Sequence, residues 1–307
     1  MLSTSEIGIQ VLKDMPVSAV RCVLPAHDLL GESPLWCTAT QSLLWLDIDG
    51  GRVQRFHPAS GRHDVSTFDA RYAGSLALTR TPGRVLLALD LALHVFDFGT
   101  GDLSLLCQVE PASLDNRLND GRCDGAGRFW VGTMDNQLSR PNGSFYRIDP
   151  DGSVHRQFGD IIVSNTVALS PRQDTLYFSD TRRFTTWRFA FDVASGTLGP
   201  RAVFVDHTAT RSRPDGACVD AEGFVWTAMF GGGRIARYSP AGELAGTIAL
   251  PVLNPTCMCL GGPDLKTLYI TTARKFLDRS QLREQPLAGA LLAIDVDVPG
   301  LPERPFG

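Results

Sequence analysis

The 307-residue sequence has little net charge and no long hydrophobic run. Its 29 Lys and Arg residues against 33 Asp and Glu residues leave a formal charge of −4, which argues against nucleic-acid binding through a basic surface. No stretch approaches the roughly 18 consecutive apolar residues of a membrane span. Residues 1–16 also lack the basic and then apolar segments of an export signal. We therefore expect a cytoplasmic protein with neither nucleic-acid nor membrane partners.

Several catalytic motifs are also missing. The six histidines are dispersed and form no H-E-x-x-H motif, and the sequence has neither a G-x-S-x-G elbow nor a P-loop. The seven cysteines are odd in number and scattered, which is typical of reduced, mostly buried thiols rather than of a disulfide framework. Cys257 and Cys259 have strand spacing and no second pair, so they favour core packing over zinc binding.

The sequence does contain a motif that is repeated six times. A turn rich in Asp, Gly or Pro precedes a short apolar or aromatic strand, and a second strand follows. The repeats centre, at intervals of 41 to 49 residues, on Trp45, Leu86, Trp130, Tyr177, Trp226 and Tyr269. Such periods in strand-like units are typical of β-propellers. We predict an all-β fold, a six-bladed β-propeller of four-stranded antiparallel blades. It forms one domain over 1–307, with a lead-in over about 1–18 and a short helical insertion near 275–285.

A further segment of small and alternating apolar residues precedes each repeat. We predict that it forms the innermost strand of each blade, where space near the axis is limited. The equivalent positions, 11 to 13 residues before each centre, are Glu32, Gly74, Asn119, Asn165, Asp215 and Thr256. Any one Asn or Asp here could simply be a turn former. Four carboxylates or carboxamides in register instead predict a shared polar pocket on the axis of the propeller.

This set of side chains is suited to a metal ion. Carboxylate and amide oxygens are hard ligands, which favour Ca²⁺, Mg²⁺ or Mn²⁺. Without a cation, Glu32 and Asp215 would repel each other, and one of them would have to take up a proton. We therefore predict one divalent cation, with Zn²⁺ and Fe²⁺ left open as alternatives.

At these residues the sequence resembles the senescence marker protein/gluconolactonase family of regucalcin-like sugar lactonases. The resemblance covers roughly residues 28–297. It rests on GESPLW (31–36), NRLNDGRCDGAGRFWVGTM (116–134), SNTVALSP (164–171), RPDGACVDAEGFVWTAMFGGGRIARYSP (213–240) and LGGPDLKTLYITTAR (260–274). The last of these, with PLAGALLAIDVDVPG (286–300), is most similar to the bacterial branch of xylonolactonases and arabinonolactonases.

The resemblance implies metal-dependent hydrolysis of a glucono-, xylono-, arabinono- or galactonolactone to the aldonic acid. It assigns the cation to Glu32, Asn165 and Asp215, with Asp215 also the candidate general base. It assigns substrate contacts to Arg117 and Asn119. A Glu that contacts substrate in regucalcin-like members is matched here by Gln137, and Asp135 is a second candidate for that contact.

Two other functions stay open at this point. One is a phosphotriesterase or aryl-esterase reaction with the same cation, because a fold does not determine a reaction. The other is a non-catalytic calcium-binding propeller, which would not need polar side chains gathered on the axis. We expect a small-molecule sugar lactone as the binding partner and a monomer or weak homo-oligomer.

Overall fold

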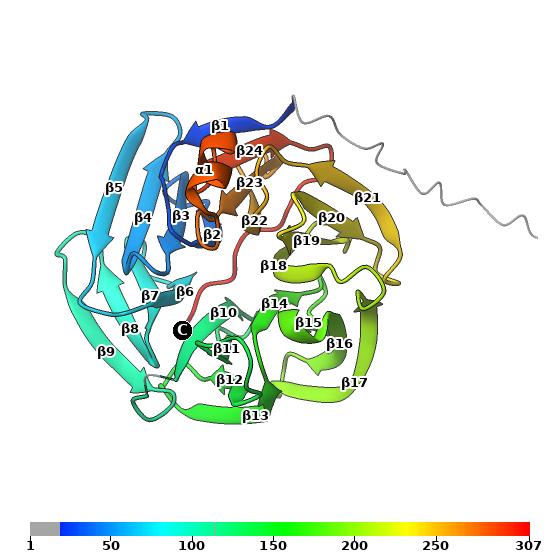
Figure 1. Cartoon of the computed structure of the whole chain (residues 1–307). Helices are drawn as coiled ribbons and strands as arrows, with labels where there is room; N and C mark the ends of the chain where they lie inside the picture. Colours follow the sequence, from blue (N-terminus) through cyan, green and yellow to red (C-terminus); the bar gives the residue numbers. More distant parts are fainter. Residues whose placement is uncertain (1–18, 114) are drawn as a thin grey trace, which may run out of the picture.

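The computed structural model describes residues 19–113 and 115–307, so the predicted lead-in over about 1–18 lies outside the described residues. The strands form six four-stranded antiparallel sheets, arranged as blades around a central axis (Figure 1). The prediction of an all-β, six-bladed propeller is therefore confirmed. No helix in the described part of the chain is long and apolar enough to cross a membrane.

Five blades are each built from four consecutive strands, ordered from the axis outwards. They are β2 (Gly31–Cys37), β3 (Ser42–Asp47), β4 (Arg52–His57) and β5 (Arg62–Thr67); β6 (Ala73–Leu78), β7 (Arg84–Leu89), β8 (Ala92–Asp97) and β9 (Leu103–Gln108); β10 (Asn116–Cys123), β11 (Phe129–Asp135), β12 (Gly143–Ile148) and β13 (Val154–Ile161); β14 (Ser164–Leu169), β15 (Thr175–Asp180), β16 (Thr185–Asp192) and β17 (Thr197–Asp206); and β18 (Arg213–Val219), β19 (Val225–Phe230), β20 (Arg234–Tyr238) and β21 (Leu244–Ala249). The segments predicted to form the innermost strand of each blade therefore do so.

The sixth blade closes the ring by joining the two ends of the chain. Its inner strands are β22 (Pro255–Gly261), β23 (Thr267–Thr272) and β24 (Leu291–Asp295), and its outer strand is β1 (Arg21–Leu24). β1 pairs antiparallel with β24. The short helix α1 (Arg279–Glu284) lies between β23 and β24, where the sequence predicts a short insertion.

Two of the repeated turns are each organised by an Asp. Oδ1 of Asp124 accepts hydrogen bonds from two backbone N–H groups of its turn at 2.9 and 3.1 Å, and Oδ2 accepts one from Nε1 of Trp130 at 2.8 Å. Asp220 holds its own turn and Trp226 in the same way. Gly127 completes the first turn at φ +82°, a conformation that favours glycine. The Asp–Gly–Trp spacing visible in the sequence is therefore one local structural unit.

The hydrophobic core lies between neighbouring blades. Each of the six interfaces between blades has its own apolar cluster. In one of them Trp226 and Ile235 of one blade share a cluster with Met258 and Leu292 of the next. Because every blade packs on two neighbours, the inner strands are held firmly around the axis, which positions the site described below.

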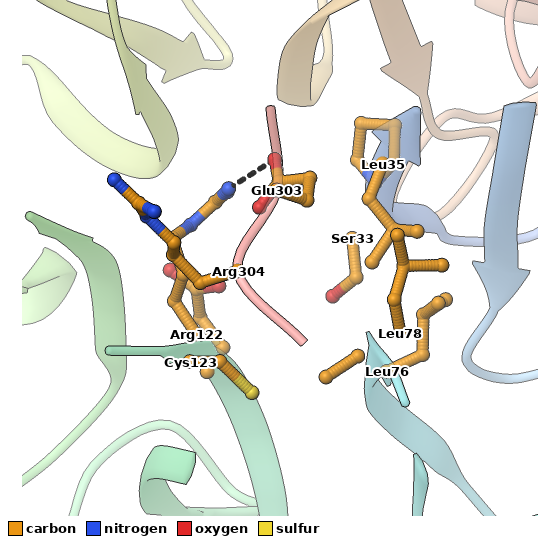
Figure 2. Close-up of a pocket in the computed structure, with 12 residues that line it drawn as sticks. Ser33, Leu35, Leu76, Leu78, Arg122, Cys123, Glu303 and Arg304 are labelled. Carbon is orange, nitrogen blue, oxygen red and sulfur yellow. Dashed lines mark hydrogen bonds and ion pairs between the residues drawn. The ribbon is translucent and has the colours of Figure 1, made fainter. Parts of the chain in front are cut away.

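The C-terminal tail, residues 299–307, runs across the centre of the ring (Figure 1). Near its end, the N–H of Phe306 donates to the carbonyl of Leu78 at the end of β6 (2.8 Å), and its ring joins the apolar cluster between two blades. Figure 2 shows Glu303 of the tail facing Arg122, which donates to its Oε1 at 2.7 Å. The tail thus closes the axis at the end where the inner strands finish.

Replacing Glu303 with Gln is expected to lower the free energy of unfolding by about 1–3 kcal/mol, because it weakens a mostly buried, charge-assisted hydrogen bond. Arg122 also donates to the backbone carbonyls of Val167 and Ala217, each at 3.2 Å, so it links the tail to two inner strands. Urea unfolding measures the change. The matched control is Asp295→Asn, which breaks the exposed pair with Arg21 and should cost less than about 1 kcal/mol. Equal losses in the two variants would contradict the structural role of the tail.

Candidate active site

A cavity of about 330 Å³ opens on the axis at the end where the inner strands begin. Its walls include Glu32 of β2, Asn119 of β10, Asn165 of β14 and Asp215 of β18. Gly74 and Thr256, the two equivalent positions without an acid or amide, are not among the residues that line it. The structure therefore brings together the four polar positions that the sequence places in register.

The inner strands are shaped locally so that these side chains reach the cavity. A β-bulge interrupts the pairing of each inner strand near the equivalent position; in β2 it falls between Glu32 and Leu35, and in β14 between Asn165 and Ala168. A bulge bends a strand and re-aims its side chains. Ser33 and Thr166, which follow two of the site residues, adopt φ values of 50° and 56° within these bulges.

Two buried carboxyl groups lie in the cavity, and their negative charges would repel each other. The side chains of Glu32 and Asp215 are buried, with only 5% and 7% of each residue exposed. Burial, followed by the nearby charge of Asp120, raises the pKa of Glu32 to about 8. Burial also raises the pKa of Asp215 well above its usual value, and the charge of Glu32 adds to this shift. Such a pair is stable when it shares a proton or binds a cation.

The two carboxylates differ in their hydrogen bonding. Oε2 of Glu32 accepts a hydrogen bond of 2.7 Å from the N–H of Ser33. The carboxylate of Asp215 accepts no hydrogen bond from any residue that the structure describes, so its oxygens are free to face a ligand in the cavity. The backbone around Asp215 is nevertheless held, since Thr166 donates to its carbonyl at 2.6 Å.

Amide and guanidinium groups form a chain along one wall of the cavity. Arg117 donates to Oδ1 of Asn119, whose Nδ2 donates to Oδ1 of Asn165 at 3.0 Å. Nδ2 of Asn165 donates in turn to the hydroxyl of Thr181 at 2.8 Å. The guanidinium of Arg117 lies 5.5 Å from the ring centre of Tyr72, which steadies it further. These contacts fix the orientation of the Asn165 amide and leave its oxygen one more lone pair for a ligand.

The donor set fits a hard divalent cation. Across residues 19–113 and 115–307 no group of three or more His, Cys, Asp or Glu side chains is arranged to hold a metal ion. A cation bound by Glu32 and Asp215 would thus need the amide oxygen of Asn165 as its third protein ligand. Two carboxylates and one amide oxygen form the kind of ligand set that Ca²⁺, Mg²⁺ and Mn²⁺ prefer.

The structure separates the two residues considered for a further substrate contact. Gln137 lines the cavity, whereas Asp135 does not. The carboxylate of Asp135 accepts hydrogen bonds from the backbone N–H groups of Ser139 and Arg140 and from the Arg140 guanidinium. Although burial acts in the opposite direction, these bonds hold the pKa of Asp135 well below its usual range. Asp135 therefore stabilises a turn beside the cavity, and its expected place among the substrate contacts is not supported.

Sequence reasoning missed several residues that line the cavity. They are Leu30, Ile48, Tyr72, Met134, Asn136, Leu138, Val163, Thr181, Arg182, Arg213, Phe230, Lys275 and Phe276. Most lie outside the six equivalent inner-strand positions, so the repeat carries no signal for them. Arg213 is an exception, because it lies two positions before Asp215 in β18 and alternation places it towards the same side.

Comparisons with known proteins show relatives in sequence and in fold. The family model described as the SMP-30/Gluconolactonase/LRE-like region matches residues 30–274. The 6-deoxy-6-sulfogluconolactonase of Pseudomonas putida is 36% identical over 289 residues, covering 94% of this chain and 98% of that protein. Regucalcin of Gallus gallus is 35% identical over 294 residues, with coverage of 94% and 98%. The crystal structure of a calcium-binding protein, regucalcin, from Agrobacterium tumefaciens superposes with a TM-score of 0.90 at 32% identity, covering 94% of this chain and 97% of that one.

Proposed function

The chain belongs to the SMP-30/gluconolactonase/LRE-like family, and we propose that it is a lactonase that opens a sugar lactone to the aldonic acid with the help of one divalent cation. The observation that carries this proposal is the meeting of Glu32, Asn119, Asn165 and Asp215 in one axial cavity. The names of its relatives support it, since one is a sulfogluconolactonase and another is described as calcium-binding. The proposed cation ligands are Glu32, Asn165 and Asp215.

The reaction adds water to a cyclic ester. When bound, the divalent cation supplies a Lewis acid for the lactone carbonyl. Asp215 is the proposed general base: its carboxylate, without a hydrogen-bond donor among the described residues, accepts a proton from the attacking water. The same carboxyl group then returns this proton to the ring oxygen as the ester C–O bond breaks. The product is the open hydroxy acid, and Asp215 is regenerated.

Other residues of the cavity hold the sugar. Arg117 presents a fixed fork of N–H donors to the hydroxyl oxygens, and Tyr72 and Asn119 limit its movement. Gln137 lines the cavity, and its proposed role is a further hydrogen bond with the substrate. The apolar side chains of Ile48 and Val163 in the wall keep bulk water from the reacting carbonyl. These residues orient the ring for attack by one water molecule.

A hydrolysis screen tests the proposed function. Pentono- and hexonolactones are incubated with the protein, and acid release is followed with a pH indicator. We expect rapid turnover of at least one aldonolactone. The rate should fall to the uncatalysed level in chelator and return when one of Mg²⁺, Ca²⁺, Mn²⁺, Zn²⁺ or Fe²⁺ is added back.

A phosphotriester and an aryl ester serve as comparison substrates, since the same scaffold and cation could act on either. Faster turnover of one of these than of every aldonolactone would overturn the assignment of a sugar lactone. Binding of the cation without turnover of any substrate would instead favour a non-catalytic calcium-binding propeller. Full activity in chelator would remove the cation from the proposal.

A further inference from the structure

The cavity has two chemically different ends. Glu32, Asn165 and Asp215 lie at its buried end, whereas Arg182 and Arg213 line it and are exposed, at its mouth. Arg213 starts the inner strand β18, and Arg182 follows the end of β15 in the neighbouring blade. The two guanidinium groups therefore come from adjacent blades and border the same part of the opening.

These two arginines have no partner within the part of the chain that the structure describes. Across residues 19–113 and 115–307, no hydrogen bond, ion pair or ring contact involves either guanidinium. Arginines beside them are engaged: Arg183 pairs with Asp160 and Asp180, and Arg211 stacks on the Phe184 ring at 4.8 Å. Among these four neighbouring arginines, the two without a partner in the described residues are thus the two that line the cavity. A guanidinium that borders a binding cavity and forms no hydrogen bond or ion pair with the described residues is available to a ligand.

The charge of the mouth is more than a neutral sugar requires. The hydroxyl groups of a neutral sugar can already form hydrogen bonds with Arg117 and Asn119. Two further guanidinium groups match an anion better, because a planar fork of donors forms paired hydrogen bonds with carboxylate, sulfonate or phosphate oxygens. The acids Glu32 and Asp215 do not neutralise them if they hold the cation of the proposed function.

We propose that the substrate is an anionic sugar lactone, with a sulfonate, phosphate or carboxylate on the carbon furthest from its carbonyl, and that Arg182 and Arg213 bind this group. The inference rests on the proposed function. A lactone whose carbonyl lies at the buried end of the cavity directs its exocyclic carbon towards the mouth, where the two arginines lie. Arg182 and Arg213 would then determine substrate specificity without touching the reacting atoms.

The test compares D-gluconolactone with forms that carry a phosphate, a sulfonate or a carboxylate at the sixth carbon. We expect kcat/KM for at least one anionic form to exceed that of the neutral lactone by about ten- to a hundred-fold, as charge-assisted hydrogen bonds allow. This preference should weaken as salt is added, because ions screen exposed charges. The three anionic forms also distinguish which anion the site selects.

Variants test whether Arg182 and Arg213 cause the preference for an anionic lactone. In the double variant Arg182→Gln, Arg213→Gln, kcat/KM for the anionic lactone should fall by about ten- to a hundred-fold, while that for the neutral lactone changes less than about two-fold. The matched control is Arg211→Gln, which removes the same charge two residues from Arg213 but leaves the cavity lining intact. It should retain the preference for the anionic lactone.

Two results would overturn the inference in distinguishable ways. Equal turnover of neutral and anionic lactones, or equal losses in the control and the double variant, rejects the anionic substrate and leaves the lactonase proposal standing. Absence of turnover with every lactone rejects both.

Discussion

We expect Asp215→Asn to lower kcat/KM for the best lactone by about 10²- to 10⁴-fold, the range for loss of a general base, which is the role proposed for Asp215. The amide cannot take a proton from water, and it is a weaker ligand for a divalent cation than the carboxylate. Glu32→Gln should cause a comparable loss, because it removes the second carboxylate of the cavity. Both are measured by steady-state kinetics at saturating cation, with circular dichroism to show that the variants fold.

The matched control for this prediction is Thr256→Ser. Thr256 occupies the equivalent position in the sixth blade but lies outside the cavity, where its hydroxyl donates to the carbonyl of Gly31 at 2.5 Å. Serine keeps this hydroxyl, so activity should stay within about two-fold of the parent, as for a substitution that retains the interaction. Retention of the full rate by both Asp215→Asn and Glu32→Gln would show that neither carboxylate takes part in the reaction.

Removing the cation should destabilise the protein as well as inactivate it. A cation present at 100 times its dissociation constant adds about 2.7 kcal/mol to the free energy of unfolding. Chelator should therefore lower the melting temperature, and a metal titration should restore it. This readout does not depend on knowing the substrate, so it tests the cation separately from the reaction.

The variant Glu32→Gln should respond much less to removal of the cation. The amide is neutral without taking up a proton, whereas the buried carboxyl of Glu32 must take one up, so at neutral pH the metal-free variant should be at least as stable as the metal-free parent. The same variant should gain much less stability from added cation, since it has lost a ligand. A metal-dependent stabilisation equal to that of the parent would contradict the assignment of Glu32 as a ligand.

The stability of the metal-free parent should also depend on pH. Glu32 has a pKa near 8 in the folded protein against an ordinary value of 4.5, so the folded state retains a proton that the unfolded state releases. The contribution of Glu32 to the free energy of unfolding should then be most favourable below about pH 4.5, and it should decrease as the pH rises towards 8. In Glu32→Gln this contribution should disappear, which denaturant titrations across the pH range can measure.

The blade repeat was predictable because its causes are local. In two blades the Asp of a turn bonds to a Trp six residues later, as Asp124 does with Trp130 and Asp220 does with Trp226, and strand alternation follows from the backbone. Ring closure was not predictable in this way. β1 pairs with β24 through residues nearly the whole chain apart, and the pairing of Arg21 with Ala293 has no local signal.

At the site, the repeat alone predicts which residues share the axis. Glu32, Asn119, Asn165 and Asp215 occupy equivalent positions in it, and a closed ring of blades must bring such positions together. The other side chains that face them could be found only in the folded chain. Asp135 is bonded to Arg140 in a turn, and Arg182 lines the cavity with no partner for its guanidinium among the described residues. The repeat fixes the inner-strand positions, whereas the surroundings of a side chain at or beyond a strand end, such as Asp135 or Arg182, differ from blade to blade and are not encoded by the repeat.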